Sequence, residues 1–393
     1  MRMTLSPLGD DILPPGIRAR FIEGVNGLRI HVLEAGQRRA DNRVLLLLHG
    51  FPELAYSWRK VMPGLAALGY HVIAPDLRGY GRTTGADTTY TSDLSTYRIL
   101  NLVRDCLGLV ASLGYRTVDA VIGHDFGSPL AAACALSRPD VFRSLVCMSA
   151  PFAGVPAWPA AADTPQRISA MTGLADPGLD VALAKLTPPR KHYQWFYSTP
   201  AANDDMWKFP EGVHAFMRAY YHMKSADWAD NLPHPLPAWS AEALAILPTY
   251  YVMAKGEGMA ETVRPHMPQA HEIAANRWLP DRELAVYAAE YTRNGYQGGL
   301  NWYRAVTGGL FAADLRTFMG RTIDVPAAFI AGKSDWGIYQ KPGDFEAMQS
   351  TACSRFRFAE IIDGAGHWVQ QEQPEAVLAA LRRFLADVPP AAR

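Results

Sequence analysis

An aspartate occupies the position where many hydrolases place a serine nucleophile. Asp125 stands in the run Gly123-His124-Asp125-Phe126-Gly127, which has the small-x-nucleophile-x-small pattern of a sharp turn between a strand and a helix. Such a turn is strained and needs small neighbours. The alternative interpretation makes Asp125 an ordinary helix N-cap. Because strand, glycines and helix all agree, we favour the nucleophile.

A carboxylate at this turn attacks differently from an alkoxide. It is ionised at neutral pH without help from a base, and it can displace a leaving group from a saturated carbon to form an ester with the protein. The N-terminus of the helix that follows stabilises its negative charge. Asp125 therefore predicts alkyl-ester chemistry rather than acyl transfer, and the ester must then be cleaved by water.

A histidine near the C-terminus is the candidate base for that water. His367 lies in Gly364-Ala365-Gly366-His367-Trp368, directly after a strand expected at 356–362, where a loop can bring an imidazole back over the sheet edge. A lone histidine after a strand is more often structural. The chain order nucleophile, acid, histidine favours His367 as the general base.

The histidine needs an acid to orient it. Asp335, in Gly332-Lys333-Ser334-Asp335-Trp336, follows a strand expected at 325–331 and would set the tautomer of the imidazole. Asp344, in a Pro-Gly-Asp turn, and Asp363, just before the glycines of the histidine loop, are competitors. Both fit turn formation better, so Asp335 is the predicted acid.

Hydrolysis of the ester develops negative charge on the Asp125 carboxyl, so two backbone N–H donors are expected beside it. One is the amide of Phe126. The other is the amide of Phe51 in His49-Gly50-Phe51-Pro52-Glu53, which follows a strand expected at 44–48. The alternative interpretation of this segment is an ordinary turn at the end of a strand.

Alternating apolar strands and helices predict the sheet that holds these residues. Two early strands, at 21–24 and 28–33, flank Asn26-Gly27, a dipeptide suited to a type I′ hairpin turn. The alternation that follows predicts an α/β fold with a mostly parallel sheet and helices on both faces. Its strands are expected at 44–48, 71–74, 118–122, 141–148, 325–331 and 356–362, and its helices at 56–68, 94–113, 129–136 and 374–385.

The alternation stops near Pro151 and resumes near Val325. The residues between them are rich in proline and aromatic side chains and include a helical stretch at 283–291. We therefore expect residues 1–150 and 322–393 to form one catalytic core, and residues 151–321 to be inserted as a mainly helical lid.

Composition disfavours several classes of protein. The 393-residue chain balances 38 Lys+Arg against 38 Asp+Glu, which gives no reason to expect nucleic acid or an anionic membrane as a partner. The four cysteines are widely spaced in apolar stretches, which is typical of reduced side chains rather than metal ligands. The sequence shows neither a signal peptide nor the roughly 18 apolar residues of a membrane span. We expect a cytoplasmic protein without a metal or cofactor.

Taken together, these motifs resemble those of the epoxide hydrolases with the α/β-hydrolase fold. The resemblance covers both core blocks and is specific in combination. It implies that fold, and it implies two lid tyrosines that hold the epoxide oxygen, which Tyr193 and Tyr303 match. The motifs that carry it are His49–Glu53, Asp76-Leu77-Arg78-Gly79-Tyr80-Gly81, Gly123–Gly127, Gly366-His367-Trp368 and Asn301-Trp302-Tyr303-Arg304.

The chemistry explains why tyrosines would be wanted. Opening an epoxide places charge on an oxygen that stays in the product, and a phenol can hydrogen-bond that oxygen and protonate it. With a pKa of about 10, a phenol stays protonated at neutral pH. A single tyrosine among 17 is more often a packing residue, and Tyr197 is the nearest alternative to Tyr193.

The lid departs from the family pattern. It is longer than a compact lid, and segments near 163–190 and 225–275 look like added material. Seven of the ten tryptophans fall in it, which favours an aromatic-walled cavity or, equally, the lid's own core. The candidates for substrate contact are Trp195, Trp302, Trp336 and Trp368.

Two alternative functions are open. A haloalkane or haloacid dehalogenase uses the same triad, but such enzymes place Trp or Arg after the nucleophile, where this chain has Phe126. The α/β-hydrolase fold also serves as a non-catalytic ligand receptor, which the retention of Asp125, Asp335 and His367 disfavours. A serine esterase is excluded because Ser128 lies beyond the turn, and a metal hydrolase lacks a His/Glu cluster with ligand spacing.

The sequence thus predicts an epoxide hydrolase that converts an apolar epoxide, with aryl epoxides as one option, to a vicinal diol through an ester on Asp125. Its expected partners are the epoxide and water, with no nucleic acid, no membrane insertion and no cofactor. The oligomeric state stays open, with a homodimer as one option.

Overall fold

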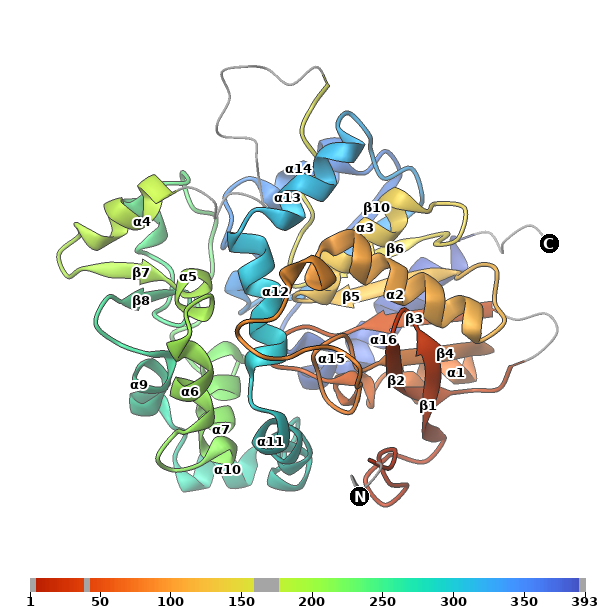
Figure 1. The fold of residues 1–393 in the computed structure, drawn as a ribbon, viewed down its shortest axis with the longest axis horizontal. Coiled ribbons are helices and arrows are strands. Elements are labelled where there is room, and N and C mark those ends of the chain that lie inside the picture. The colour runs from red at the N-terminus through yellow and green to blue at the C-terminus, as the bar shows by residue number, and fades with distance from the viewer. Residues whose placement is uncertain (1–4, 39–42, 159–176, 389–393) are drawn as a thin grey trace.

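An eight-stranded sheet organises the chain in the computed structural model, which describes residues 5–38, 43–158 and 177–388 (Figure 1). The strand order is β1-β2-β4-β3-β5-β6-β9-β10. β2 pairs antiparallel with β1 and β4, and the other neighbours are parallel. The strands are β1 (Ile17–Val25), β2 (Leu28–Ala35), β3 (Arg43–Leu48), β4 (Tyr70–Pro75), β5 (Ala120–His124), β6 (Leu145–Met148), β9 (Ala327–Gly332) and β10 (Phe356–Ile362).

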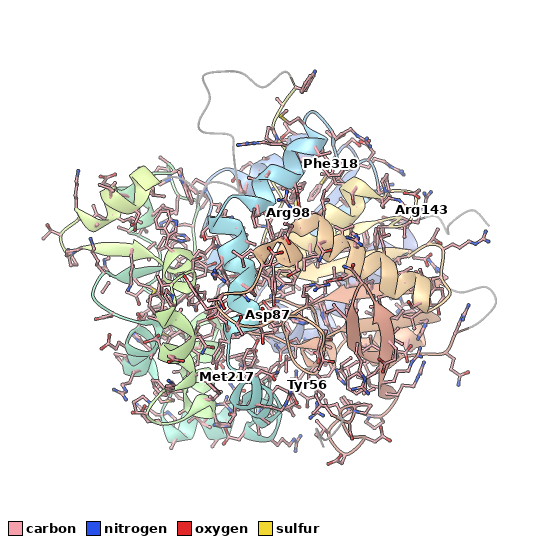
Figure 2. All side chains as sticks on the ribbon, in the orientation of Figure 1. Tyr56, Asp87, Arg98, Arg143, Met217 and Phe318 are labelled. Atoms are coloured by element: carbon pink, nitrogen blue, oxygen red, sulfur yellow. The ribbon has the colours of Figure 1, made fainter. Side chains whose placement is uncertain are left out.

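Helices cover both faces of this sheet, as the alternation predicts. α2 (Ile99–Ser112) and α3 (Gly127–Ser137) lie on one face, and α16 (Pro374–Ala386), with α1 (Met62–Ala67) against it, lies on the other (Figure 1). Residues 44–48 of β3 are all 0% exposed, which is why this strand is apolar throughout instead of alternating. Side chains fill the space between the layers (Figure 2).

The predicted hairpin and most predicted strands are confirmed, with ends shifted by a few residues. Asn26 has φ 48° and Gly27 has φ 81°, as a type I′ turn requires at both positions. The strand expected at 141–148 is shorter, because only Leu145–Met148 joins the sheet.

Two predicted helices are wrong, because each is interrupted. Segment 56–68 forms a short 3-10 helix, η1 (Ala55–Trp58), and then α1. Pro63 lies in the first turn of α1 and has no N–H to continue a helix from the residues before it. Segment 94–113 breaks at Arg98, whose φ of −62° and ψ of 147° are extended; its side chain pairs with Asp314.

The chain leaves the sheet after β6 and returns at β9, and the described residues between them are mainly helical, as expected for a lid. The helix expected at 283–291 is confirmed within α11. Residues 163–176 of one suspected insertion lie outside the described part, while 225–275 carry short helices and one strand. The core and lid limits stay a prediction. The lid elements are α4 (Pro177–Ala184), β7 (Arg190–His192), α5 (Tyr193–Tyr197), α6 (Ala201–Trp207), α7 (Val213–Lys224), α8 (Ala241–Leu244), β8 (Val252–Ala254), α9 (Met259–Val263), α10 (Ala270–Ala275), α11 (Asp281–Asn294), α12 (Gln297–Thr307) and α13 (Leu310–Leu315).

The turn between β5 and α3 has the strained geometry that its sequence predicts. Asp125 has φ 50°, in the left-handed region that few non-glycine residues adopt. A Cβ on Gly123 would lie 1.9 Å from the carbonyl oxygen of Gly127, and one on Gly127 would lie 2.1 Å from that of Leu48. Both neighbours of the turn must therefore be glycine.

This packing predicts the effect of adding one methyl group. We expect Gly123→Ala to lower the free energy of unfolding by about 3 kcal/mol, because the clashing atoms belong to the backbone and cannot rotate away. Gly256→Ala is the control, since a Cβ there meets nothing within 4 Å, and it should change stability by less than about 0.5 kcal/mol. Urea unfolding followed by circular dichroism measures both, and equal losses would contradict the explanation.

Candidate active site

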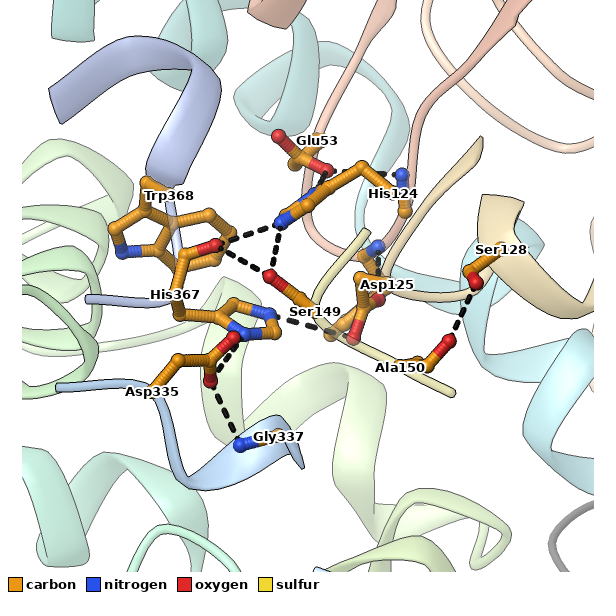
Figure 3. Close-up of polar contacts among 12 residues, drawn as sticks. Glu53, His124, Asp125, Ser128, Ser149, Ala150, Asp335, Gly337, His367 and Trp368 are labelled. Carbon is orange, nitrogen blue, oxygen red and sulfur yellow. Dashed lines mark hydrogen bonds and ion pairs between the residues drawn. The ribbon is translucent and has the colours of Figure 1, made fainter. Parts of the chain in front are cut away.

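Asp125, Asp335 and His367 converge at one edge of the sheet (Figure 3). They follow β5, β9 and β10, and the carboxyl ends of parallel strands meet at the same edge. His367 Nε2 lies 3.3 Å from Asp125 Oδ2, and His367 Nδ1 lies 3.0 Å from Asp335 Oδ1. The structure thus brings together the three residues predicted as nucleophile, base and acid.

Asp335 is the aspartate that contacts the histidine, whereas its two competitors lie elsewhere. The amide of Gly337 donates to Asp335 Oδ1 at 2.7 Å, which fixes the carboxylate in place. Asp363 pairs with Lys333 at 2.7 Å, and Asp344 begins the short helix α14 (Asp344–Ala347).

The Asp125 carboxylate is held by one of the two predicted backbone donors. The amide of Phe51 donates to Asp125 Oδ1 at 2.9 Å. Gly50 makes this approach possible, since a Cβ there would lie 2.4 Å from the Cβ of Asp125. Among the hydrogen bonds of the described residues, none joins the amide of Phe126 to this carboxylate, so the role of Phe126 stays a prediction.

A buried histidine–carboxylate pair supports the site from behind, and sequence reasoning missed it. His124 Nδ1 lies 2.5 Å from Glu53 Oε2, and its Nε2 lies 2.6 Å from the carbonyl oxygen of His367 and 3.0 Å from Ser149 Oγ. Glu53 also accepts the amide of Gly50 at 2.9 Å. Both side chains are 0% exposed. Glu53 lies in the His49–Glu53 motif and His124 in the Gly123–Gly127 motif, and these positions were the signal that could have revealed the pair.

Opposing effects set the charges of the catalytic groups. Burial alone would raise the pKa of Asp125, but the hydrogen bond and charge of His367, with the charge of Lys224, hold it well below its usual value. Burial also acts to raise the pKa of Asp335, but the charge and the hydrogen bond of His367 outweigh burial, so this pKa is lowered. Asp125 is therefore ionised at neutral pH, which a carboxylate nucleophile requires.

A cavity with about 440 Å³ of empty space, part of it open to solvent, lies above Asp125. One wall is apolar, and the rings of Phe126 and Tyr303 meet there edge to face at 4.7 Å. The other end carries the polar side chains of Gln194, Gln340 and Lys341, which the expectation of an aromatic-walled cavity did not include. The lining residues are Asp125, Phe126, Pro129, Ala150, Tyr193, Gln194, Tyr303, Val306, Phe311, Gln340 and Lys341.

Both predicted lid tyrosines line this cavity. The ring centroids of Tyr193 and Tyr303 are 5.9 Å apart, and Gln194 Nε2 donates to the Tyr193 hydroxyl at 2.9 Å. Burial, followed by the nearby Asp125 charge, raises the pKa of Tyr193 well above 10, and burial with the charges of Tyr193 and Asp125 does the same for Tyr303. The alternative, Tyr197, instead donates to the Tyr220 hydroxyl at 3.3 Å.

The four tryptophans proposed for substrate contact are not among the residues that line this cavity, and we correct that expectation. Trp302 and Trp368 are buried and donate to the backbone carbonyls of Arg78 and Tyr221, each at 2.9 Å. Trp195 and Trp336 pack near histidine rings, at 5.9 Å and 4.9 Å between centroids. Large aromatic side chains serve here as packing.

Across residues 5–38, 43–158 and 177–388, no group of three or more His, Cys, Asp or Glu side chains is arranged to hold a metal ion. No helix in those ranges has the length and apolar character needed to cross a bilayer. The four cysteines are free and buried.

The fold and the triad define a hydrolase of the α/β-hydrolase class, and comparison with known proteins narrows the family. A family model described as alpha/beta hydrolase fold matches residues 43–234. Epoxide hydrolase A of Mycobacterium tuberculosis is 32% identical over 375 residues, which cover 92% of this chain and 95% of that protein. Epoxide hydrolase B of the same organism is 29% identical over 93% of this chain and 97% of its own. The chain belongs to the epoxide-hydrolase family of this fold.

Solved structures agree with this assignment. An epoxide hydrolase from an endophytic Streptomyces superimposes with a TM-score of 0.73 at 29% identity, covering 95% of this chain and 96% of that one. Epoxide hydrolase A from Mycobacterium thermoresistibile gives a TM-score of 0.72 at 30% identity, with 95% and 99% covered. Potato epoxide hydrolase I gives 0.70 at 29% identity, with 94% and 99% covered.

The contacts of His367 predict its titration in the free protein. Burial and the charge of Lys224 lower its pKa, but the charge of Asp335 and the hydrogen bonds to Asp125 and Asp335 outweigh them and raise it above 6.5. We expect Asp125→Asn to lower this pKa, because one of the supporting carboxylates is lost. NMR titration of histidine-labelled protein, with His367→Gln to assign the resonance, measures the change. An unchanged or higher pKa in Asp125→Asn would contradict these causes.

Proposed function

We propose that this epoxide hydrolase opens apolar epoxides through a covalent ester on Asp125. The observation that carries the proposal is that the two oxygens of the Asp125 carboxylate contact different groups. Oδ1 accepts the Phe51 amide, whereas Oδ2 lies 3.3 Å from His367 Nε2. Tyr193 and Tyr303 line the same cavity as Asp125. An epoxide in this cavity would therefore meet a nucleophile and two phenols that can protonate its oxygen.

In the first step, Asp125 Oδ2 attacks a ring carbon of the epoxide and the carbon–oxygen bond on the far side breaks. Tyr193 and Tyr303 hydrogen-bond the ring oxygen, and one of them transfers its proton as negative charge develops there. A neutral phenol suits this task because the raised pKa of each tyrosine keeps the proton in place until the oxygen becomes basic.

In the second step, water cleaves the ester. Neutral His367 takes a proton from water through Nε2, and the hydroxide adds to the carboxyl carbon of Asp125. The charge then falls on Oδ1, where the amide of Phe51 already donates, with Phe126 as the second proposed donor. Collapse expels the diol oxygen, which receives the proton from His367, and leaves Asp125 as the protonated acid. Loss of that proton restores the carboxylate, and the tyrosine that gave up its proton in the first step regains one, so the cycle balances.

The cavity walls favour an aryl or other apolar group on the epoxide. Phe126 and Phe311, with ring centroids 6.2 Å apart, offer edges and faces to an aromatic ring. The end lined by Gln340 and Lys341 suits a polar substituent. A cytoplasmic location remains an expectation from the sequence, and a homodimer remains one option. The tyrosine pair favours the epoxide reaction over halide release.

Loss of the base should trap the ester. We expect His367→Gln to retain ester formation and to lose hydrolysis, so that intact mass spectrometry after incubation with styrene oxide shows protein carrying one added substrate mass. Asp125→Asn is the control and should show no adduct. Absence of an adduct in His367→Gln with an epoxide that the unmodified enzyme turns over would exclude the ester mechanism.

Loss of one tyrosine should slow ring opening. We expect Tyr303→Phe to reduce the rate of ester formation by at least about tenfold, because a general acid commonly supplies a factor of 10² to 10⁴ and Tyr193 remains. Tyr197→Phe is the matched control, since its hydroxyl contacts Tyr220, and it should stay within about twofold. Rapid-quench measurements with styrene oxide give both rates; equal effects would refute the assignment of Tyr303.

A further inference from the structure

A carboxylate holds the backbone on both sides of the catalytic histidine. Glu372, at the end of α15 (Val369–Glu372), accepts the amide of Gly366 on Oε2 and that of Trp368 on Oε1, each at 2.9 Å. These are the two residues that flank His367. Within the described residues, the hydrogen bonds to the Glu372 carboxylate all come from backbone amides, so it acts on the imidazole through the backbone.

The same carboxylate is bonded to the lid. The amide of Ala226 donates to Glu372 Oε2 at 2.8 Å, and the amide of His367 donates to the carbonyl oxygen of Lys224 at 2.8 Å. The approach is close, because a Cβ on Gly366 would lie 2.5 Å from the carbonyl carbon of Ser225. Three consecutive amides of the histidine loop are thus bonded either to Glu372 or to the end of α7.

The end of α7 is itself firmly held. Asn231 Nδ2 donates to the carbonyl oxygens of Met223 and Ser225, each at 2.8 Å, and the Tyr250 hydroxyl donates to Asn231 Oδ1 at 2.7 Å. The ammonium of Lys224 lies among aromatic rings, 4.9 to 5.8 Å from their centroids, where a cation is attracted to the ring faces. The rings belong to Tyr220, Tyr250, Tyr251 and Trp368.

We propose that Glu372 is a positioning residue for His367, through which the lid end at residues 224–226 sets the rate of ester hydrolysis. The inference rests on the proposed ester mechanism. Glu372 and the α7 end hold the histidine loop from the lid side, while the His124 imidazole holds the carbonyl of His367 from the core side.

The two steps of the reaction depend differently on this support. Ester formation needs only the carboxylate and the lid tyrosines, and His367 transfers no proton in it. Hydrolysis needs Nε2 aligned with a water molecule that attacks the Asp125 carboxyl, and small displacements of a catalytic group are costly. Loosening the loop should therefore slow the second step selectively.

The test variant is Glu372→Gln. Glutamine keeps the shape but has a single acceptor oxygen, so it cannot serve the amides of Gly366, Trp368 and Ala226 together. Burial raises the pKa of Glu372 to about 8, while these three amides oppose the shift, so the experiment is run at pH 9 to favour the ionised form of the native side chain. Glu375→Gln, on the exposed first turn of α16, is the matched control.

Single-turnover rapid-quench experiments with styrene oxide separate the two steps by intact mass. We expect Glu372→Gln to form the ester within about twofold of the native rate and to hydrolyse it at least about tenfold more slowly, so that adduct accumulates, whereas Glu375→Gln should leave both steps unchanged. A purely structural role would lower the amount of active protein without altering the ratio of the two rates. An unaltered ratio in Glu372→Gln would overturn the proposal.

A lid-side variant keeps the test decisive if Glu372→Gln does not fold. Asn231→Leu removes the donors that hold the α7 end, and we expect ester hydrolysis to slow about threefold with ester formation unchanged. A native ratio of the two rates in this variant would overturn the proposal. Failure of the ester mechanism itself is recognised separately, because His367→Gln would then give no adduct.

Discussion

The structure depends on keeping one buried carboxylate ionised. Asp125 is 8% exposed, and an unpaired charge at such a place would take up a proton instead. The Phe51 amide and the His367 imidazole satisfy its two oxygens. Each of these partners requires a particular backbone arrangement, with Gly50 allowing close approach of one loop and the C-terminal loop returning over the sheet edge to deliver the other.

Core and lid contribute to different ends of the same bond-breaking event. The core presents the carboxylate, its amide donor and the base, while the lid presents Tyr193 and Tyr303 above them. The lid also reaches the base, since its α7 end bonds the backbone of His367. In the proposed mechanism the residues inserted between two strands are thus part of the catalytic site as well as a cover over the cavity.

The sequence was sufficient for the triad and for most strands because both depend on local patterns. A strained turn leaves its glycines in the sequence around Asp125, and buried parallel strands leave apolar runs. Contacts between distant segments leave no such trace. The interruption at Arg98, which pairs with Asp314 of the lid, and the pairing of His124 with Glu53 are of this kind. The expectation that four tryptophans contact the substrate was wrong because the size of a tryptophan predicts that it is buried, but not which residues it packs against.

The ion pair between Asp125 and His367 also imposes an order on the two halves of the cycle. In the resting enzyme the contact between the two groups lowers the pKa of Asp125 and raises the pKa of His367, so each group favours the charged form of the other. In the proposed mechanism the ester removes the charge of Asp125, whereas the Lys224 charge that opposes protonation of His367 persists. The imidazole then releases its proton more readily. In that mechanism, formation of the ester therefore favours the neutral imidazole that the second step requires.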